Sequence, residues 1–254
     1  MTSATATAWP PASAEATSSA QLFSGRPLPR AGHVLAVTAR PGPESADLGA
    51  LLYAFRRRGA SLALLTLTRG EASPVNSTCE RPEDIRPWEL QVAAGLLGIT
   101  SLTVADYPDG ALYRYPPAEL TERVRRAIRT HAADLLLVVD PASGSAHRDP
   151  ADAAMARADA AVARADAAVA RAVCAAAEQT GIPVLARMPR PARYGWHVDL
   201  GLAATARLVQ RAAVAAHASQ AVAEPRPDRP DRPDHSDHSG HREQLRWLIP
   251  PPRG

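Results

Sequence analysis

Short apolar runs alternate with amphipathic stretches through the middle of the chain. Continuous apolar runs predict buried strands at 33–38, 61–68, 101–105, 135–139 and 182–186. Apolar residues at helical spacing predict helices over 46–58, 82–97, 117–131, about 151–179 and about 202–222. Strands that are apolar throughout and alternate with helices indicate an α/β fold. We expect three layers around a doubly wound, mostly parallel sheet of the Rossmann-like type.

Three regions of the chain differ in composition. Residues 1–31 are rich in Pro, Ser, Thr and Ala and predict a disordered N-terminal tail, whereas 32–222 hold the strand–helix alternation of one domain. Residues 223–254 begin with repeated Pro, Asp and His, which predict a mobile segment, and end with apolar residues that could return to the domain surface. The mobile segment carries three histidines suited to adventitious metal binding: His235, His238 and His241.

The helix predicted at about 151–179 contains an internal repeat. Residues 156–162 recur without change as 163–169, and the period of seven places Met155, Val162 and Val169 on one seam. An alanine-rich helix of this length would extend roughly 45 Å. One interpretation is a coiled-coil arm through which the protein binds partners or forms a homo-oligomer. The other is an in-frame duplication that only lengthens the helix, which the small side chains of the seam favour.

Composition excludes several classes of function. The net charge is +3 and aromatic residues make up 4% of the 254 residues, a poor basis for nucleic-acid binding. The chain has no lysine, which excludes Schiff-base chemistry and a P-loop. Cys79 and Cys174 are isolated, so we expect neither a disulfide framework nor a zinc knuckle. Without a signal peptide or an apolar run long enough for a membrane span, the sequence predicts a cytoplasmic protein.

The loops after the predicted strands are the expected place for chemistry, because parallel sheets bind ligands at the carboxyl ends of their strands. Six segments there and on the neighbouring helices resemble, in order, motifs of the LmbE-like (PIG-L) amide-hydrolase family. They are 38–45 (TARPGPES), 66–71 (TLTRGE), 86–90 (RPWEL), 107–110 (YPDG), 140–150 (DPASGSAHRDP) and 217–220 (HASQ). The resemblance spans residues 32–220. It implies an LmbE-type fold and an ancestry among zinc-dependent enzymes that deacetylate N-acetylglucosamine conjugates.

The same resemblance implies that this chain lacks the family's metal site. The positions of the family's three zinc ligands hold Arg40, Pro43 and Pro150, and the position of its general base holds Gly42. Proline has no side-chain donor atom, and an arginine remains protonated and repels a cation. We therefore expect no cofactor.

Several polar residues of the resembling motifs remain. His147 and Asp149 match the family's oxyanion-stabilising histidine and the acid beside it, and they could act as an acid/base couple. The residues expected to bind substrate are Arg40, Glu44, Arg69, Arg86 and Asp109. Arg86 and its neighbour Glu89 could instead be structural.

Three functions therefore stay open. The first is a zinc-independent or non-catalytic relative that binds a small polar or anionic molecule, such as a sugar or thiol-sugar conjugate. The second is an active metal-dependent deacetylase, a hydrolase of linear amides, whose ligands include His33, His197 or the histidines at 235–241. The third is an interaction protein that uses the repeat helix. Of the histidines, His33 opens the first strand at its amino end, the wrong end of the sheet for catalysis.

Overall fold

The fold is a single mixed sheet covered by helices on both faces. The structure, a computed structural model, describes residues 28–72, 81–141, 153–188, 196–199, 203–220 and 242–252. Its strands are β1 (His33–Thr38), β2 (Ser61–Thr68), β3 (Ser101–Tyr107), β4 (Leu135–Val139), β5 (Val184–Arg187), β6 (Trp196–Asp199) and β7 (Arg242–Ile249). They lie in the order β3-β2-β1-β4-β5-β7-β6, and β7 pairs antiparallel with both of its neighbours. The α/β prediction is confirmed.

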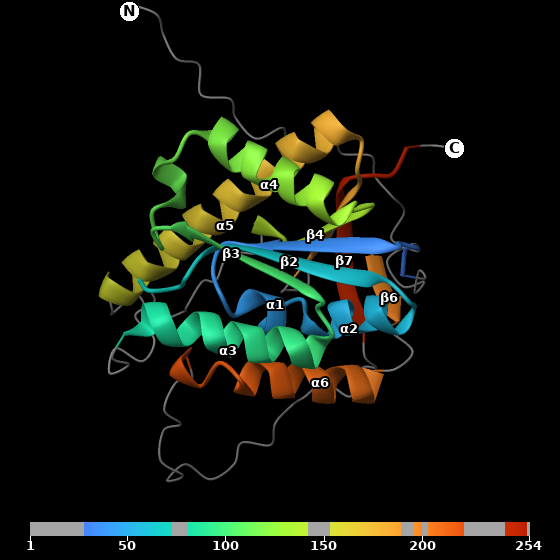
Figure 1. Cartoon of the computed structure of the whole chain (residues 1–254), viewed down its shortest axis with the longest axis horizontal. Helices are drawn as coiled ribbons and strands as arrows, with labels where there is room; N and C mark the ends of the chain where they lie inside the picture. The colour runs from blue at the N-terminus through green and yellow to red at the C-terminus, as the bar shows by residue number, and fades with distance from the viewer. Residues whose placement is uncertain are drawn as a thin grey trace, which may run out of the picture.

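Helices form the two outer layers of the domain. They are α1 (Pro43–Ala46), α2 (Gly49–Arg57), α3 (Pro82–Leu97), α4 (Pro117–His131), α5 (Ala153–Thr180) and α6 (Ala203–Ala215), with short 3-10 turns η2 (Leu112–Arg114) and η4 (Ala218–Gln220). Figure 1 shows α4 and α5 on one face of the sheet and α1, α2, α3 and α6 on the other. Each face has its own buried cluster, because β1 sends Val34 and Ala36 to one layer and Leu35 and Val37 to the other.

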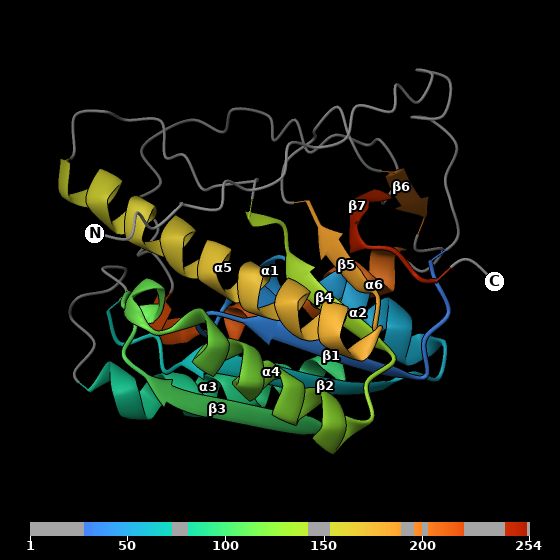
Figure 2. The ribbon, with the colours of Figure 1, turned by 90° about the horizontal axis from the view of Figure 1, so that it is seen from above.

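The carboxyl ends of the central strands meet at one edge of the sheet. β1 pairs in parallel with β2 and with β4, so Thr38 lies beside Thr66, and their hydroxyl oxygens are 3.0 Å apart. In Figure 2 the first turns of α5 project beyond this edge. The part of α5 that follows packs on the domain, since Ala165, Ala168 and Val169 are buried. The second copy of the repeat is thus part of the core rather than a free arm.

The first predicted helix begins earlier and is interrupted. We expected one helix over 46–58, but α1 starts at Pro43 and α2 at Gly49. Proline has the backbone angle of a first helical turn, which favours a start there. The amide of Leu48 then bonds the Pro43 carbonyl, five residues back, so the turn widens before α2 begins.

Two strands were not predicted. Residues 242–249 were expected only to return to the domain surface, yet they form β7 inside the sheet. β6 is a four-residue strand whose only described pairing is with β7. Both depend on contacts between distant parts of the chain, which local periodicity does not reveal.

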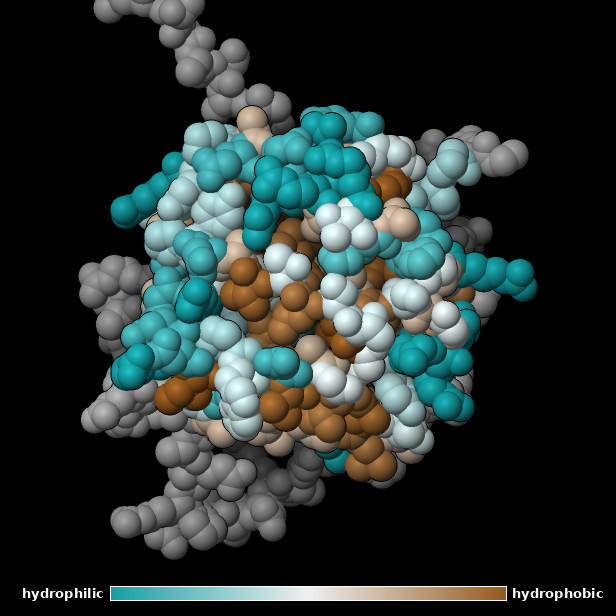
Figure 3. Space-filling model, viewed as in Figure 1, coloured by the Kyte–Doolittle hydropathy of each residue, from teal (hydrophilic) through white to brown (hydrophobic). Residues whose placement is uncertain are grey.

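The helices and the surface of the domain have two further properties. None of the helices in the described ranges has the length and apolar content needed to span a membrane. Seen from the side of edge strand β3, hydrophobic side chains gather over β3, α3 and α6 (Figure 3).

Candidate functional site

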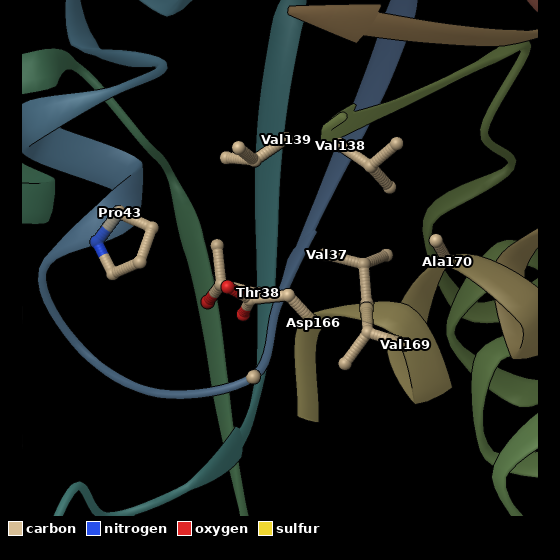
Figure 4. Close-up of a pocket in the computed structure, with 9 residues that line it drawn as sticks. Val37, Thr38, Pro43, Val138, Val139, Asp166, Val169 and Ala170 are labelled. Carbon is tan, nitrogen blue, oxygen red and sulfur yellow. The ribbon is translucent and has the colours of Figure 1, made fainter. Parts of the chain in front are cut away.

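A small hollow lies at the carboxyl ends of β1 and β4, between α1 and α5. It measures about 270 Å³ including its open mouth. Its walls are mostly aliphatic, and Pro43 forms one side (Figure 4). Of the described residues that line it, Thr38 and Asp166 are polar and Asp166 alone is charged. The hollow stands where parallel sheets bind ligands.

Arg40 and Asp166 form an ion pair at this hollow. Arg40 lies in the loop after β1, and its Nη1 atom is 3.5 Å from Oδ1 of Asp166 on α5. Burial raises the pKa of Asp166, and the charge of Arg40 offsets part of that rise. Arg40 Nη1 is buried and donates no hydrogen bond within the described part of the chain. It therefore retains a donor that a polar ligand could use.

The loop between Arg40 and α1 is built around Gly42. Its φ of 117° lies in the region that favours glycine. A Cβ atom there would lie 3.2 Å from Oε1 of Gln220, closer than an ordinary contact. The Gly42 amide donates to Glu44 Oε2 at 2.7 Å and so closes the turn. This backbone suits glycine at the position where the family resemblance places the general base.

Glu44 lies at the centre of a buried hydrogen-bond network. It is fully buried, and its Oε1 atom is 2.7 Å from Nε2 of His217. Ser45 Oγ donates to the same oxygen at 2.8 Å, and Gln220 Nε2 lies 3.3 Å from Nδ1 of His217. A neutral His217 satisfies this set if Nε2 carries the proton and Nδ1 accepts from Gln220. Both oxygens of Glu44 are thus used inside the protein, and its predicted contact with substrate stays a prediction.

Arg86 and Glu89 are also buried, on α3. Arg86 is 1% exposed and Glu89 is 4% exposed. The Glu89 carboxylate accepts from the amide and from the hydroxyl of Ser219, each at 2.6 Å. These charge-assisted bonds hold η4 against α3. The geometry gives Glu89 the structural role that the sequence left open.

Arg69 and Asp109 lie further along the same edge of the sheet. Arg69 Nε donates to Asp106 Oδ1 at 2.7 Å, both side chains are well exposed, and this bond raises the pKa of Arg69. Asp109 accepts from the Thr68 hydroxyl at 3.1 Å and from the Ala72 amide at 3.2 Å, so it shapes the turn after β2. Neither side chain lines the hollow.

A second charged cluster adjoins the hollow, and the sequence did not predict it. Arg187, at the end of β5, donates to Asp47 at 2.9 Å and to Glu243 of β7 at 3.0 Å. Glu243 is also 2.6 Å from Nη2 of Arg207. Burial raises the pKa of Asp47, while the charges of Arg187 and Arg40 act to lower it. The cluster forms only when β7 enters the sheet, so no local motif announces it.

Asp166 was also missed, although its motif was noticed. The repeat places an aspartate at the same point of each copy, and nothing in the local sequence says which one reaches the site. His147, Asp149 and Pro150 lie outside the described residues, as do the histidines at 235–241. Their predicted roles stay predictions.

The described residues do not fit a zinc site of the family's type. Such a site needs three donor side chains, usually including histidine, around one point. Nowhere in the described ranges do three His, Cys, Asp or Glu residues gather in this way. At the loop after β1 the side chains offered are the guanidinium of Arg40 and the ring of Pro43, and neither binds a cation.

Comparisons with known proteins place this geometry in a family context. Residues 35–161 match the family described as PIG-L, GlcNAc-PI de-N-acetylase. A probable N-acetyl-alpha-D-glucosaminyl L-malate deacetylase 2 of Bacillus anthracis is 30% identical over 114 residues, 43% of this chain and 50% of that protein. A 1D-myo-inositol 2-acetamido-2-deoxy-alpha-D-glucopyranoside deacetylase of Kineococcus radiotolerans is 26% identical over 161 residues, 51% of this chain and 45% of that protein. The chain spans about half the length of the curated relatives it matches.

Solved structures agree on the fold. The N,N'-diacetylchitobiose deacetylase of Pyrococcus horikoshii has a TM-score of 0.58 at 15% identity, covering 86% of this chain and 84% of that one. A deacetylase in the biosynthesis pathway of teicoplanin has a TM-score of 0.60 at 15% identity, covering 85% and 96%. At such identities the likeness concerns the fold alone.

Proposed function

The chain belongs to the PIG-L family of GlcNAc-PI de-N-acetylases, and from this premise we propose that it is a member that binds a small polar ligand without zinc. The ligand site is the hollow at the carboxyl ends of β1 and β4. We expect a sugar or a thiol-sugar conjugate. The names of the relatives described above, deacetylases of an N-acetyl-glucosaminyl malate and of an acetamido-glucopyranoside, support the sugar part of this expectation.

The ion pair between Arg40 and Asp166 is the observation that carries this proposal. It occupies the loop in which the family resemblance places the metal ligands, and Pro43 closes the wall beside it. The guanidinium supplies a positive charge that needs no metal, and Asp166 is its counter-ion. A dication added here would be repelled by Arg40 and would find one carboxylate, already paired.

The residues that line the hollow also restrict which kinds of ligand can bind there. Thr38 and Asp166 offer a hydroxyl and a carboxylate, and the nearby Arg40 Nη1 offers a buried donor. The remaining wall is aliphatic. A ligand with several hydroxyl groups, or with one anionic group directed at Arg40, complements this arrangement.

Any hydrolysis by this chain would depend on its own acid and base groups. His147 and Asp149 are the proposed couple, with the histidine moving a proton to or from the scissile amide. Without a metal to activate water, hydrolysis of an unactivated amide loses several kcal/mol of stabilisation. We therefore propose binding as the main activity.

An active metal-dependent deacetylase is the second candidate, and the family match supports it. Its ligands would come from residues outside the described ranges, such as His147 or the histidines at 235–241. Two measurements separate the candidates. One is the metal content of untagged protein by mass spectrometry, and the other is release of acetate from N-acetylglucosamine conjugates.

We expect zinc well below one equivalent and saturable binding of an N-acetylglucosamine conjugate. Arg40→Met should weaken this binding by about 10-fold or more, because it removes one charge-assisted hydrogen bond. Stoichiometric zinc that is lost in His147→Ala, together with acetate release, would establish the second candidate and refute the first. Gln91→Glu, on the outer surface of α3, is the control for both measurements.

A further inference from the structure

Helix α3 carries an apolar stripe on its outer surface that the domain core does not use. Ile85, Trp88, Val92 and Leu96 are 38%, 66%, 39% and 46% exposed. Their spacing of three, four and four residues places them along one side of the helix. The core-facing side consists of other residues: Arg86, Glu89, Leu90, Ala93, Ala94 and Leu97. We call the first set the outer α3 stripe.

We infer that the outer α3 stripe is the contact surface between two copies of this chain. Single exposed apolar side chains are ordinary, but a contiguous apolar row marks an interaction site. This row extends over about 16 Å of helix. At its middle lies Trp88, the residue type most enriched among the energetically dominant residues of protein interfaces. Hydrophobic side chains of β3 and α6 flank it on the same face (Figure 3).

The stripe is self-complementary under twofold symmetry, which favours a second copy over an unrelated partner. When two α3 helices pack antiparallel about an axis between Trp88 and Val92, Trp88 of one copy faces Val92 of the other. Ile85 then faces Leu96. Each contact occurs twice, as a twofold interface requires, and the large indole meets the smallest side chain of the row, which allows close packing.

The charges at the two ends of α3 favour the same antiparallel arrangement. Glu83 is exposed at the amino end and makes no ion pair among the described residues, while Asp84 already pairs with Arg81. At the carboxyl end Arg56 is exposed and its side chain lies against Gly98. Antiparallel packing brings Glu83 towards Arg56 of the other copy, whereas parallel packing would separate them. This attraction is minor beside the apolar contact.

The available surface approaches what a stable dimer needs. A specific interface buries about 800 Å² per partner around an apolar centre. The outer α3 stripe supplies the centre. A tryptophan side chain buries roughly 150–250 Å² when it is covered completely, and the 66% of Trp88 that is exposed remains available. The neighbouring helix α6 also carries an exposed apolar side chain, Leu208, which is 64% exposed. The exposed polar residues of α3, such as Gln91, can form the rim.

This surface is distinct from the repeat helix that the sequence suggested. α5 covers the opposite face of the sheet (Figure 1), and its side chains from Ala165 onwards are largely buried in the domain. Substitutions on α3 and on α5 therefore test two separate hypotheses of self-association.

Sedimentation velocity of the full chain over a range of concentrations tests the inference. We expect a concentration-dependent dimer. Trp88→Glu should weaken dimerisation by about 30-fold or more, the loss typical of a central interface residue. Leu96→Glu, at the end of the row, should weaken it as well. Thr130→Glu adds the same charge to an exposed position of α4, on the opposite face of the sheet (Figure 1), and should leave the dimer unchanged. Circular dichroism melts verify that each variant is folded.

A crosslinking experiment tests the antiparallel register. In a background with Cys79→Ala and Cys174→Ala, Trp88→Cys combined with Val92→Cys should form an intermolecular disulfide on mild oxidation. Either single cysteine should crosslink far less. A monomer at every concentration would overturn the inference, whether or not the stripe then binds another protein. A dimer that survives Trp88→Glu and Leu96→Glu would place the interface elsewhere and overturn it equally.

Discussion

Changing Asp166 to Asn should not lower the free energy of unfolding at pH 7, although it removes the charged partner of Arg40. Burial raises the pKa of Asp166 despite that partner, so folding disfavours the carboxylate relative to its neutral form. Asparagine resembles the neutral form. Changing Arg40 to Met, in contrast, leaves the carboxylate without compensation and should destabilise the protein.

The size of the coupling free energy between Arg40 and Asp166 follows from the geometry of the pair. Arg40 Nη1 and Asp166 Oδ1 are 3.5 Å apart, and the two side chains are 20% and 29% exposed. Unit charges about 4 Å apart attract by ~1 kcal/mol in water and by ~4 kcal/mol at an effective dielectric constant of about 20. Fully exposed pairs measure roughly 0.2–1 kcal/mol. A half-screened pair should therefore show a coupling free energy of about 1–2 kcal/mol.

The effect should depend on pH with a defined sign. The unfolded carboxyl titrates near the ordinary value of 3.8 and the folded one at a higher pKa. Between these two values the native state holds more protons, so the contribution of Asp166 to stability falls as pH rises through the window. Glu122 is the control, because its hydrogen bond with Arg129 lowers its pKa. The stabilisation by Glu122 is present above the ordinary pKa of 4.5 and is lost as pH falls. Glu122→Gln should therefore change the slope of the unfolding free energy against pH in the direction opposite to Asp166→Asn.

Urea denaturation measures both the coupling free energy and the pH dependence of stability. It is applied to the wild type, Arg40→Met, Asp166→Asn and the double variant, from pH 4 to pH 7. A coupling free energy below about 0.3 kcal/mol would mean that the pair contributes nothing beyond a surface contact. A loss of several kcal/mol on Asp166→Asn alone, with no change in how the free energy of unfolding depends on pH, would refute the assignment of Asp166 to a partly buried, desolvated site.

Three further predictions concern the surroundings of the site. Gly42→Ala should lower the free energy of unfolding by about 1–2 kcal/mol in urea, because φ at this position is 117° and Gln220 is close; no loss would show that the loop relaxes freely. His217→Ala should cost about 1.5–3 kcal/mol in the same assay, since it removes one donor from the buried Glu44 carboxylate, which keeps its bonds from Ser45 and the Gly42 amide, and a cost below about 1 kcal/mol would contradict the buried network. Burial raises the pKa of Cys174 to about 11, so alkylation of the folded protein, followed by mass spectrometry, should accelerate up to about that pH; a rate that levels off near pH 9 would count against burial of the thiol.

Sequence periodicity predicted the layers of the fold because its cause is local. The strands at 33–38 and 135–139 are apolar throughout, which suits a sheet covered on both faces, and this holds in β1 and β4. The start of α1 was missed because the hydrophobic pattern begins later than the turn that Pro43 initiates. β7 was missed because its partner, β5, lies more than fifty residues earlier in the chain.

The sequence by itself determined that the loop after β1 offers Arg40, Gly42 and Pro43 at the positions where the family resemblance places metal-binding and catalytic side chains. That conclusion required only residue identities, because no folding can give proline a donor atom. The partner of Arg40 was decided by tertiary structure. The two identical copies of the repeat offer Asp159 and Asp166, and a looser copy ahead of them, ending at Met155, offers Asp152. The non-repeating half of α5 selects among them. If α5 were shifted along its axis by one seven-residue repeat, Asp166 would lie where Val173 now lies, fully buried in the core. The free-energy cost of burying that charge fixes the position of the helix along the sheet.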